Sequence, residues 1–295
     1  MNNIVPKLKQ NATIAFIAPA GCITERQNIE CAKKYFEELG YKVIFGENLF
    51  KRNKYMSGSD EERLADLHWA FADKSIDGII CARGGYGCLR LINKIDYELI
   101  KDNKKFFCGY SDITVLSAML LKRANLITYS GPMAKGDFGI EQRSQYTMEN
   151  FFKTINKDKD KKIEHLSTKQ YSEGNAEGIL FGGNLASIVS LCGIDFIPDE
   201  KFIFFAEDLN EPVYKIDKMF TQLLNIEKFR KNVTGIILGD FLDTGYPEQL
   251  DELFIEISNR LRMPVLSGFK ISHNTDKITL PIGAKGQIIE NKLIY

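Results

Sequence analysis

The sequence lacks the features that mark several classes of protein. Its 295 residues carry 39 basic and 39 acidic side chains, so no net charge attracts nucleic acid or anionic lipid. No apolar run approaches the roughly 20 residues that span a bilayer. The first apolar run is short and ends in a turn rather than a cleavage site. We therefore expect a cytoplasmic protein without a signal peptide, with no membrane or nucleic-acid partner.

Cysteine and histidine occur without the spacing that functional clusters need. The six cysteines form no C-x-x-C pair, and no His, Cys and carboxylate set has metal-ligand spacing. We expect reduced thiols, no metal and no cofactor. Of three histidines, His68 lies on the apolar side of a predicted helix and His165 in a polar stretch, where we expect it to be solvated. His273, in a turn-rich stretch, is the leading candidate for a base.

The first half of the chain alternates strand and helix patterns. Capping boxes are predicted at Thr24–Gln27 and at Ser59–Glu62, each followed by apolar residues at helical spacing. Apolar runs predict strands at 12–20, 41–45, 77–82, 105–110 and 125–133. This alternation predicts a parallel sheet, with a binding crevice beyond the carboxyl ends of its strands.

A lysine-rich polar stretch at 148–175 shows little periodicity and is where we expect the domain boundary. We predict an N-terminal domain over 1–150, a linker over 151–175 and a C-terminal domain over 176–295. In the second half, strands are expected at 201–208 and 233–241, and helices at 213–224 and 248–261.

Ser111 follows a predicted strand in "GYSDI" (109–113). A strand-to-helix turn there would expose the hydroxyl beside the unpaired N–H groups of a helix start, as in the nucleophile elbow G-x-S-x-G. Ile113 replaces the second glycine, so this stretch alone favours Ser111 as the N-cap of a helix over 111–122. A nucleophile would need a base such as His273.

The acid that would orient such a base is not decided by spacing. Glu207 and Asp208 end the apolar strand "FIFFAED", where one carboxylate could point inward. Asp112 and Glu211 compete with them.

The stretch "ARGGYG" (82–87) places glycines after a strand, where backbone N–H groups can approach an anion. Arg83 could pair with a carboxylate there. A tight turn is the structural alternative. A non-catalytic nucleotide-binding module is another, although neither G-x-x-x-x-G-K-[ST] nor G-x-G-x-x-G is present.

Taken together, nine stretches in order resemble the LD-carboxypeptidase (muramoyltetrapeptide carboxypeptidase) family of serine peptidases. They span nearly the whole chain: "IAPAG" (17–21), "SGSDEERLADL" (57–67), "ARGGYG" (82–87), "CGYSDIT" (108–114), "TYSGPM" (128–133), "GGNL" (182–185), "EDLNEPVYKIDKM" (207–219), "GFKISH" (268–273) and "TLPIGA" (279–284).

This resemblance implies a triad in which Ser111 is the nucleophile, Glu207 the charge-relay acid and His273 the base. It implies an α/β fold with an N-terminal Rossmann-like parallel-sheet domain, a C-terminal α/β domain, an active site in the cleft between them, and a homodimer. The residues implied around the triad are backbone N–H groups of Asp112 and of Gly84 or Gly85 for the oxyanion, and Arg83, Tyr86 and Asn184 for the substrate.

The chain departs from the family at three positions: Ser272 precedes the histidine where Gly is common, and Lys215 and Lys218 replace frequent Arg. The implied reaction is hydrolysis of the bond before D-alanine in a murein tetrapeptide with lysine or diaminopimelate as its third residue. The microcin C immunity peptidases, which cleave aminoacyl- or peptidyl-adenylates, belong to the same family. They tend to be longer, with an added aromatic loop, whereas this chain is compact and its only tryptophan is Trp69.

Overall fold

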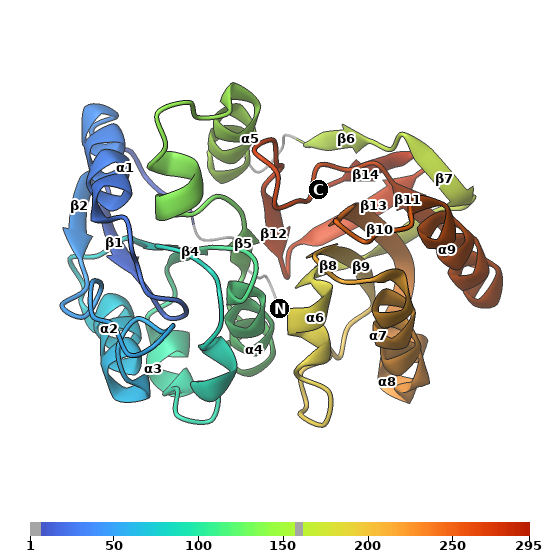
Figure 1. Ribbon diagram of the computed structural model, residues 1–295, viewed down its shortest axis with the longest axis horizontal. Helices are drawn as coiled ribbons and strands as arrows, with labels where there is room; N and C mark the ends of the chain where they lie inside the picture. The colour runs from blue at the N-terminus through green and yellow to red at the C-terminus, as the bar shows by residue number, and fades with distance from the viewer. Residues whose placement is uncertain (1–6, 157–161) are drawn as a thin grey trace.

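The computed structural model describes residues 7–156 and 162–295, and its elements form two sheets side by side (Figure 1). The first sheet has the strand order β12-β5-β4-β3-β1-β2, in which β1 to β5 are parallel and β12 is antiparallel to β5. Its strands are β1 (Thr13–Ile17), β2 (Lys42–Phe45), β3 (Gly78–Cys81), β4 (Phe106–Cys108), β5 (Thr128–Ser130) and β12 (Leu280–Ile282).

Helices cover both faces of the first sheet, as the alternating pattern predicts. Apolar side chains of α1 and α5 pack on one face, together with the π-helical turn η2, and those of α2, α3 and α4 pack on the other. These elements are α1 (Arg26–Glu38), α2 (Asp60–Ala72), the 3₁₀ turn η1 (Cys88–Arg90), α3 (Tyr97–Asp102), α4 (Ile113–Ala124), η2 (Ala134–Phe138) and α5 (Gln145–Ile155).

The second sheet has the order β6-β14-β13-β8-β9-β10-β11-β7, with β8 to β11 parallel and the outer strands antiparallel. The two-domain α/β fold expected from the sequence is confirmed. The remaining elements are β6 (Glu164–Leu166), β7 (Lys169–Ser172), β8 (Ala176–Asn184), α6 (Leu185–Val189), β9 (Phe202–Leu209), α7 (Val213–Asn225), α8 (Glu227–Asn232), β10 (Val233–Leu242), α9 (Pro247–Leu261), β11 (Val265–Ser267), β13 (Lys285–Ile289) and β14 (Lys292–Ile294).

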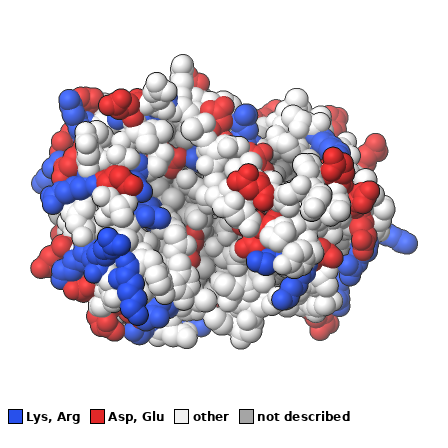
Figure 2. All heavy atoms as spheres, in the orientation of Figure 1, with Lys and Arg blue, Asp and Glu red and all other residues white. Residues whose placement is uncertain are grey.

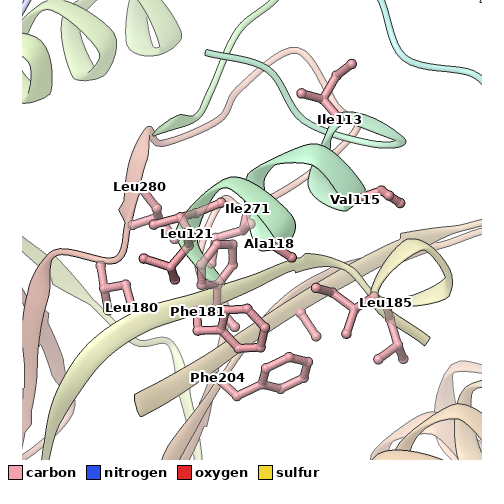
Figure 3. Close-up of a cluster of buried hydrophobic side chains, with 14 of the residues drawn as sticks. Ile113, Val115, Ala118, Leu121, Leu180, Phe181, Leu185, Phe204, Ile271 and Leu280 are labelled. Atoms are coloured by element: carbon pink, nitrogen blue, oxygen red, sulfur yellow. The ribbon is translucent and has the colours of Figure 1, made fainter. Parts of the chain in front are cut away.

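Helix α4 packs between the two sheets. Ten of its twelve residues are buried, which is expected of a helix that is apolar nearly all round. Figure 3 shows Val115, Ala118 and Leu121 near side chains of the second sheet and of α6, among them Leu180, Phe181 and Leu185. The helix that begins just after Ser111 is thereby held by both halves of the molecule.

The C-terminal part of the chain returns to the first sheet. Strand β12 lies in the range expected to form the C-terminal domain, yet it pairs with β5, with Leu280 opposite Ser130 and Ile282 opposite Thr128. The segment between β11 and β12 contains His273. This segment is therefore held at one end by β11 of the second sheet and at the other end by β12 of the first sheet.

The two predicted capping boxes have different outcomes. At the start of α2, the Ser59 hydroxyl accepts from the Glu62 N–H and the Glu62 carboxylate accepts from the Ser59 N–H, as expected. The box at Thr24 is wrong: α1 begins at Arg26, and the Thr24 hydroxyl donates to the carboxylate of Glu25 instead.

The stretch read as a linker contains regular structure in its described part. It holds the end of α5, whose apolar face includes Phe151 and Ile155, and the strands β6 and β7. Those strands are mostly exposed edge strands, so they lack an apolar pattern. His165 on β6 is not solvated, because Nε2 lies 2.9 Å from the Tyr295 hydroxyl. Burial lowers the pKa of His165 to about 4.

Candidate active site

Ser111 lies in a strained turn between β4 and α4. Its φ is 63°, the left-handed region that non-glycine residues rarely adopt and that costs about 1–2 kcal/mol. Helix α4 starts at Ile113, with Asp112 as an N-cap that makes no side-chain capping bond. Ser111 is therefore not the N-cap, and the turn has the sharp strand-to-helix geometry of a nucleophile elbow despite Ile113.

The "ARGGYG" loop runs directly beside the Ser111 hydroxyl. A Cβ placed on Gly84 would lie 2.7 Å from Ser111 Cβ and 2.9 Å from Oγ, so only glycine fits. Gly85 has a φ of 113°, which also favours glycine. The Gly21 N–H donates to the Gly84 carbonyl at 3.1 Å and fixes the loop against the turn that follows β1.

Two buried side chains hold this loop in place. The Asp112 carboxylate accepts from the Cys88 N–H at 2.9 Å, and burial raises the pKa of Asp112. Asp112 thus supports the loop with its side chain, while its own N–H lies at the N-cap of α4. Arg63, whose side chain is fully buried, donates to the carbonyls of Pro19 and Gly87. Arg63 is not among the residues predicted from the sequence. Its position on the apolar face of α2, four residues before Leu67, is nevertheless a detectable signal.

His273 is paired with Glu207 on the other side of the site. The distance from His273 Nδ1 to Glu207 Oε2 is 2.7 Å, and Glu207 is buried at the end of β9. Burial by itself would lower the pKa of His273, but the hydrogen bond with Glu207 and its negative charge outweigh burial and raise it.

The competing acids have other partners. Asp208, the next residue on β9, accepts from the Asn184 amide at 2.9 Å and from the Ala186 N–H at 2.8 Å, and burial raises its pKa. Glu211 is half-buried and pairs with Lys215 at 3.3 Å. Of the four candidate acids, Glu207 is the one that forms a hydrogen bond with His273.

Ser111 and His273 line one cleft of about 340 Å³. Gly85, Tyr86, Asp112 and Asn184 also line it. The acids on its wall are Asp112, Asp208 and Glu211, and no lysine or arginine is among the lining residues. On the face shown in Figure 2, basic and acidic side chains are interspersed over both halves, and the seam between the halves is mostly uncharged.

The three predicted substrate residues occupy different places. Tyr86 is exposed at the cleft and its ring lies 5.9 Å from that of Tyr55. Asn184 lines the cleft, but its amide oxygen accepts from Ser187 N–H to cap α6. Arg83 is absent from the cleft wall and donates to the carbonyls of Cys22 and Gly84. Their roles toward a substrate stay predictions.

The described residues 7–156 and 162–295 contain no group of three His, Cys, Asp or Glu side chains arranged to hold a metal ion. In the same residues, none of the helices combines the length and apolar character needed to cross a membrane. His68 Nε2 accepts from the Asp96 N–H at 2.9 Å, which confirms the structural role expected of this histidine.

Comparison with known proteins decides the family. A model of the LD-carboxypeptidase N-terminal domain matches residues 14–131, and a model of the C-terminal domain matches residues 177–288. This chain belongs to the LD-carboxypeptidase family. The resemblance inferred from the nine stretches is confirmed, and the chain is a serine-type carboxypeptidase, which excludes the non-catalytic nucleotide-binding module.

Relatives within the LD-carboxypeptidase family carry two kinds of name. A probable murein peptide carboxypeptidase of Bacillus subtilis is 36% identical, covering 96% of this chain and 91% of its own. The muramoyltetrapeptide carboxypeptidase of Oxalobacter formigenes has a TM-score of 0.85 at 29% identity, covering 96% and 97% of the two chains. An MccFlike protein of Bacillus anthracis has a TM-score of 0.90 at 29% identity, covering 98% of each chain.

Proposed function

We propose that this protein hydrolyses the amide bond between an L-configured centre and a terminal D-alanine in murein tetrapeptides. The observation that carries the proposal is the 2.7 Å contact between His273 Nδ1 and Glu207, in a cleft that also exposes the strained Ser111. The names of the Bacillus subtilis and Oxalobacter formigenes relatives support the substrate class. The third residue of the tetrapeptide would be lysine or diaminopimelate.

In the acylation step, Ser111 Oγ attacks the carbonyl carbon before D-alanine. Because Nδ1–H is donated to Glu207, Nε2 of His273 is the nitrogen that takes the hydroxyl proton. The negative oxygen of the tetrahedral intermediate receives hydrogen bonds from the N–H of Asp112, at the N-cap of α4, and of Gly84 or Gly85. The C–N bond then breaks, and His273 gives its proton to the amine of the leaving D-alanine.

In the deacylation step, a water molecule attacks the ester carbon and His273 takes the water proton. The C–Oγ bond breaks, the shortened peptide leaves as a carboxylate, and His273 returns the proton to Ser111. Glu207 stabilises the imidazolium in both steps. Its effect on the pKa of His273 supports this role, because Glu207 favours the protonated ring against the effect of burial.

We further propose a cytoplasmic homodimer that acts on fragments released during cell-wall recycling. The even balance of acidic and basic residues fits a small peptide substrate rather than a nucleic acid. Sedimentation velocity of the purified protein tests the dimer.

A second candidate is cleavage of an aminoacyl- or peptidyl-adenylate, which would use the same acyl transfer to Ser111. The observation that favours it is the close likeness to the MccFlike protein, with a TM-score of 0.90. The compact cleft without a tryptophan on its wall favours the murein peptide.

Both substrates should be assayed with one preparation, and mass spectrometry should follow D-alanine release and amide cleavage of the adenylate. The proposal predicts D-alanine release with the higher kcat/KM. Preferential cleavage of the adenylate would replace it by the second candidate. If neither substrate is turned over, both candidate functions are contradicted.

A further inference from the structure

The segment that carries His273 is attached to the N-terminal half by several hydrogen bonds. The Lys277 N–H donates to Thr147 Oγ at 2.8 Å, and the Ser144 hydroxyl donates to Asp276 at 2.6 Å. Thr147 and Ser144 belong to the start of α5, and the segment then enters β12 of the first sheet. The position of His273 relative to Ser111 thus depends on contacts with the half that carries the serine.

The most buried of these contacts is an ion pair. The Lys277 ammonium is paired with the carboxylate of Asp137, and both side chains are about 95% buried. Asp137 also accepts from the Met133 N–H at 2.8 Å. Removing two charges from water is costly, and a buried pair often contributes no more stability than apolar residues of similar size. A role beyond stability would explain an ion pair at this place.

The ring of Tyr110 lies between this pair and His273. Lys277 Nζ is 4.8 Å from the ring centroid, and the rings of Tyr110 and His273 meet edge to face with centroids 5.1 Å apart. Tyr110 also directly precedes Ser111 in the elbow. One ring therefore contacts the base and the buried ammonium, and its backbone leads into the turn of the nucleophile.

These residues lie behind the site rather than in the substrate cleft. Tyr110, Glu207 and Lys277 line a separate cavity of about 10 Å³, which has room for about one water molecule and for no substrate group. Neither Lys277 nor Asp137 is on the wall of the 340 Å³ cleft. The side-chain contacts that lead from the pair toward the catalytic residues run through Tyr110 to His273.

We infer that Asp137 and Lys277 are positioning residues that, through the ring of Tyr110, hold the imidazole of His273 in place toward Ser111. The inference rests on the proposed roles of Ser111, Glu207 and His273.

Lys277 also acts on the charge of His273. The groups that act on the imidazole are Glu207 and Asp208 of β9, which favour its protonated form, and Lys277, which opposes it. Tyr110 is a neutral phenol, because burial and then the charges of Asp137 and Glu207 raise its pKa well above the ordinary value. Loss of the Lys277 ammonium should therefore raise the pKa of His273.

The test uses Lys277→Met combined with Asp137→Asn, which removes both charges at once. Lys277→Met alone would leave the Asp137 carboxylate buried without its cation and would destabilise the fold. The readout is the rate at which a fluorophosphonate labels Ser111 as a function of pH, which does not depend on the identity of the natural substrate. Thermal melts establish that the variant is folded.

The double variant is expected to melt near the wild-type temperature but to label Ser111 at least about tenfold more slowly. The acid limb of its pH profile should move to higher pH. Ser144→Ala is the matched control, because it removes a bond between the same segment and α5 without touching Tyr110 or His273. Its labelling rate should stay close to that of the wild type.

A folded double variant with wild-type rate and pH profile would overturn the inference. If the double variant does not fold, Tyr110→Leu and Tyr110→Phe decide: slower labelling in the leucine variant than in the phenylalanine variant supports the inference, and equal rates overturn it. Wild-type protein that is not labelled at Ser111 would contradict the proposed triad and, with it, this inference. The two failures are therefore distinguishable.

Discussion

The two sides of the cleft are built in different ways. The serine side consists of backbone: a left-handed turn at Ser111, the glycines of the "ARGGYG" loop, and the N–H groups of the first turn of α4. The histidine side consists of side chains brought together over long separations, 66 residues between Glu207 and His273 and 140 between Asp137 and Lys277. Steric changes should therefore damage the first side, and changes of charge the second.

On the histidine side, the largest effect is expected from Glu207→Gln. The amide keeps the shape of the carboxylate but removes the charge that raises the pKa of His273 and favours the correct tautomer. We expect kcat to fall by about 10⁴-fold. Steady-state kinetics at the pH optimum measures this loss. Asp208→Asn is the control and should retain much more activity, because the hydrogen bonds of this neighbouring acid go to Asn184 and Ala186 and not to His273.

On the serine side, Gly84→Ala should lower kcat by about 100-fold or more, because the new methyl group would lie 2.9 Å from Ser111 Oγ and displace the loop. Gly136→Ala is the matched control, since a Cβ there meets nothing within 4 Å. Kinetics and thermal melts of both variants separate catalysis from stability. Equal activity in the two variants would show that the loop does not need to lie this close to Ser111.

Removing a side chain that supports the "ARGGYG" loop should first lower the free energy of unfolding. Arg63→Met removes the buried guanidinium that binds the carbonyls of Pro19 and Gly87, and we expect a loss of about 3 kcal/mol in the free energy of unfolding. Arg63 also pairs with the carboxylate of Asp60 at 2.6 Å. Arg90 binds that carboxylate from an exposed position, so Arg90→Met should change stability little. Urea unfolding of the two variants compares them, and a similar loss in both would contradict the role given to Arg63.

The smallest effect is expected on the pH dependence of the free energy of unfolding, to which His273 and His165 contribute with opposite signs. The folded pKa of His273 is raised, so its stabilisation is full below the unfolded value of about 6.5 and is lost as pH rises through the folded value. The folded pKa of His165 is lowered to about 4, so its contribution is present above about 6.5 and is lost as pH falls toward 4. Urea unfolding of His273→Gln and His165→Gln between pH 4 and 8 should show slopes that differ from the wild type in opposite directions.

The same contrast explains how much could be predicted from the sequence. The strands and helices of the first half follow local patterns, and the capping box at Ser59 and the turn at Ser111 are local as well. Edge strands β6 and β7 carry no apolar pattern, and the pairing of β12 with β5 joins residues about 150 positions apart, so neither could be predicted.

The residues of the site also divide into those that could be predicted from the sequence and those that could not. Spacing alone left several acids in competition, and only the resemblance to the family singled out Glu207, which the fold places against His273. Arg63 had a detectable signal as a basic residue on an apolar helix face. Asp137 and Lys277 had none, because a buried ion pair between distant segments leaves no local pattern.

The most direct test of the account compares D-alanine release from murein tetrapeptide by the wild type and by Ser111→Ala, with mass spectrometry of both reactions. The wild type should release D-alanine, and Ser111→Ala should lose at least about 10³-fold in kcat while keeping a normal thermal melt. Release of D-alanine by folded Ser111→Ala at the wild-type rate would contradict the assignment of Ser111 as the nucleophile.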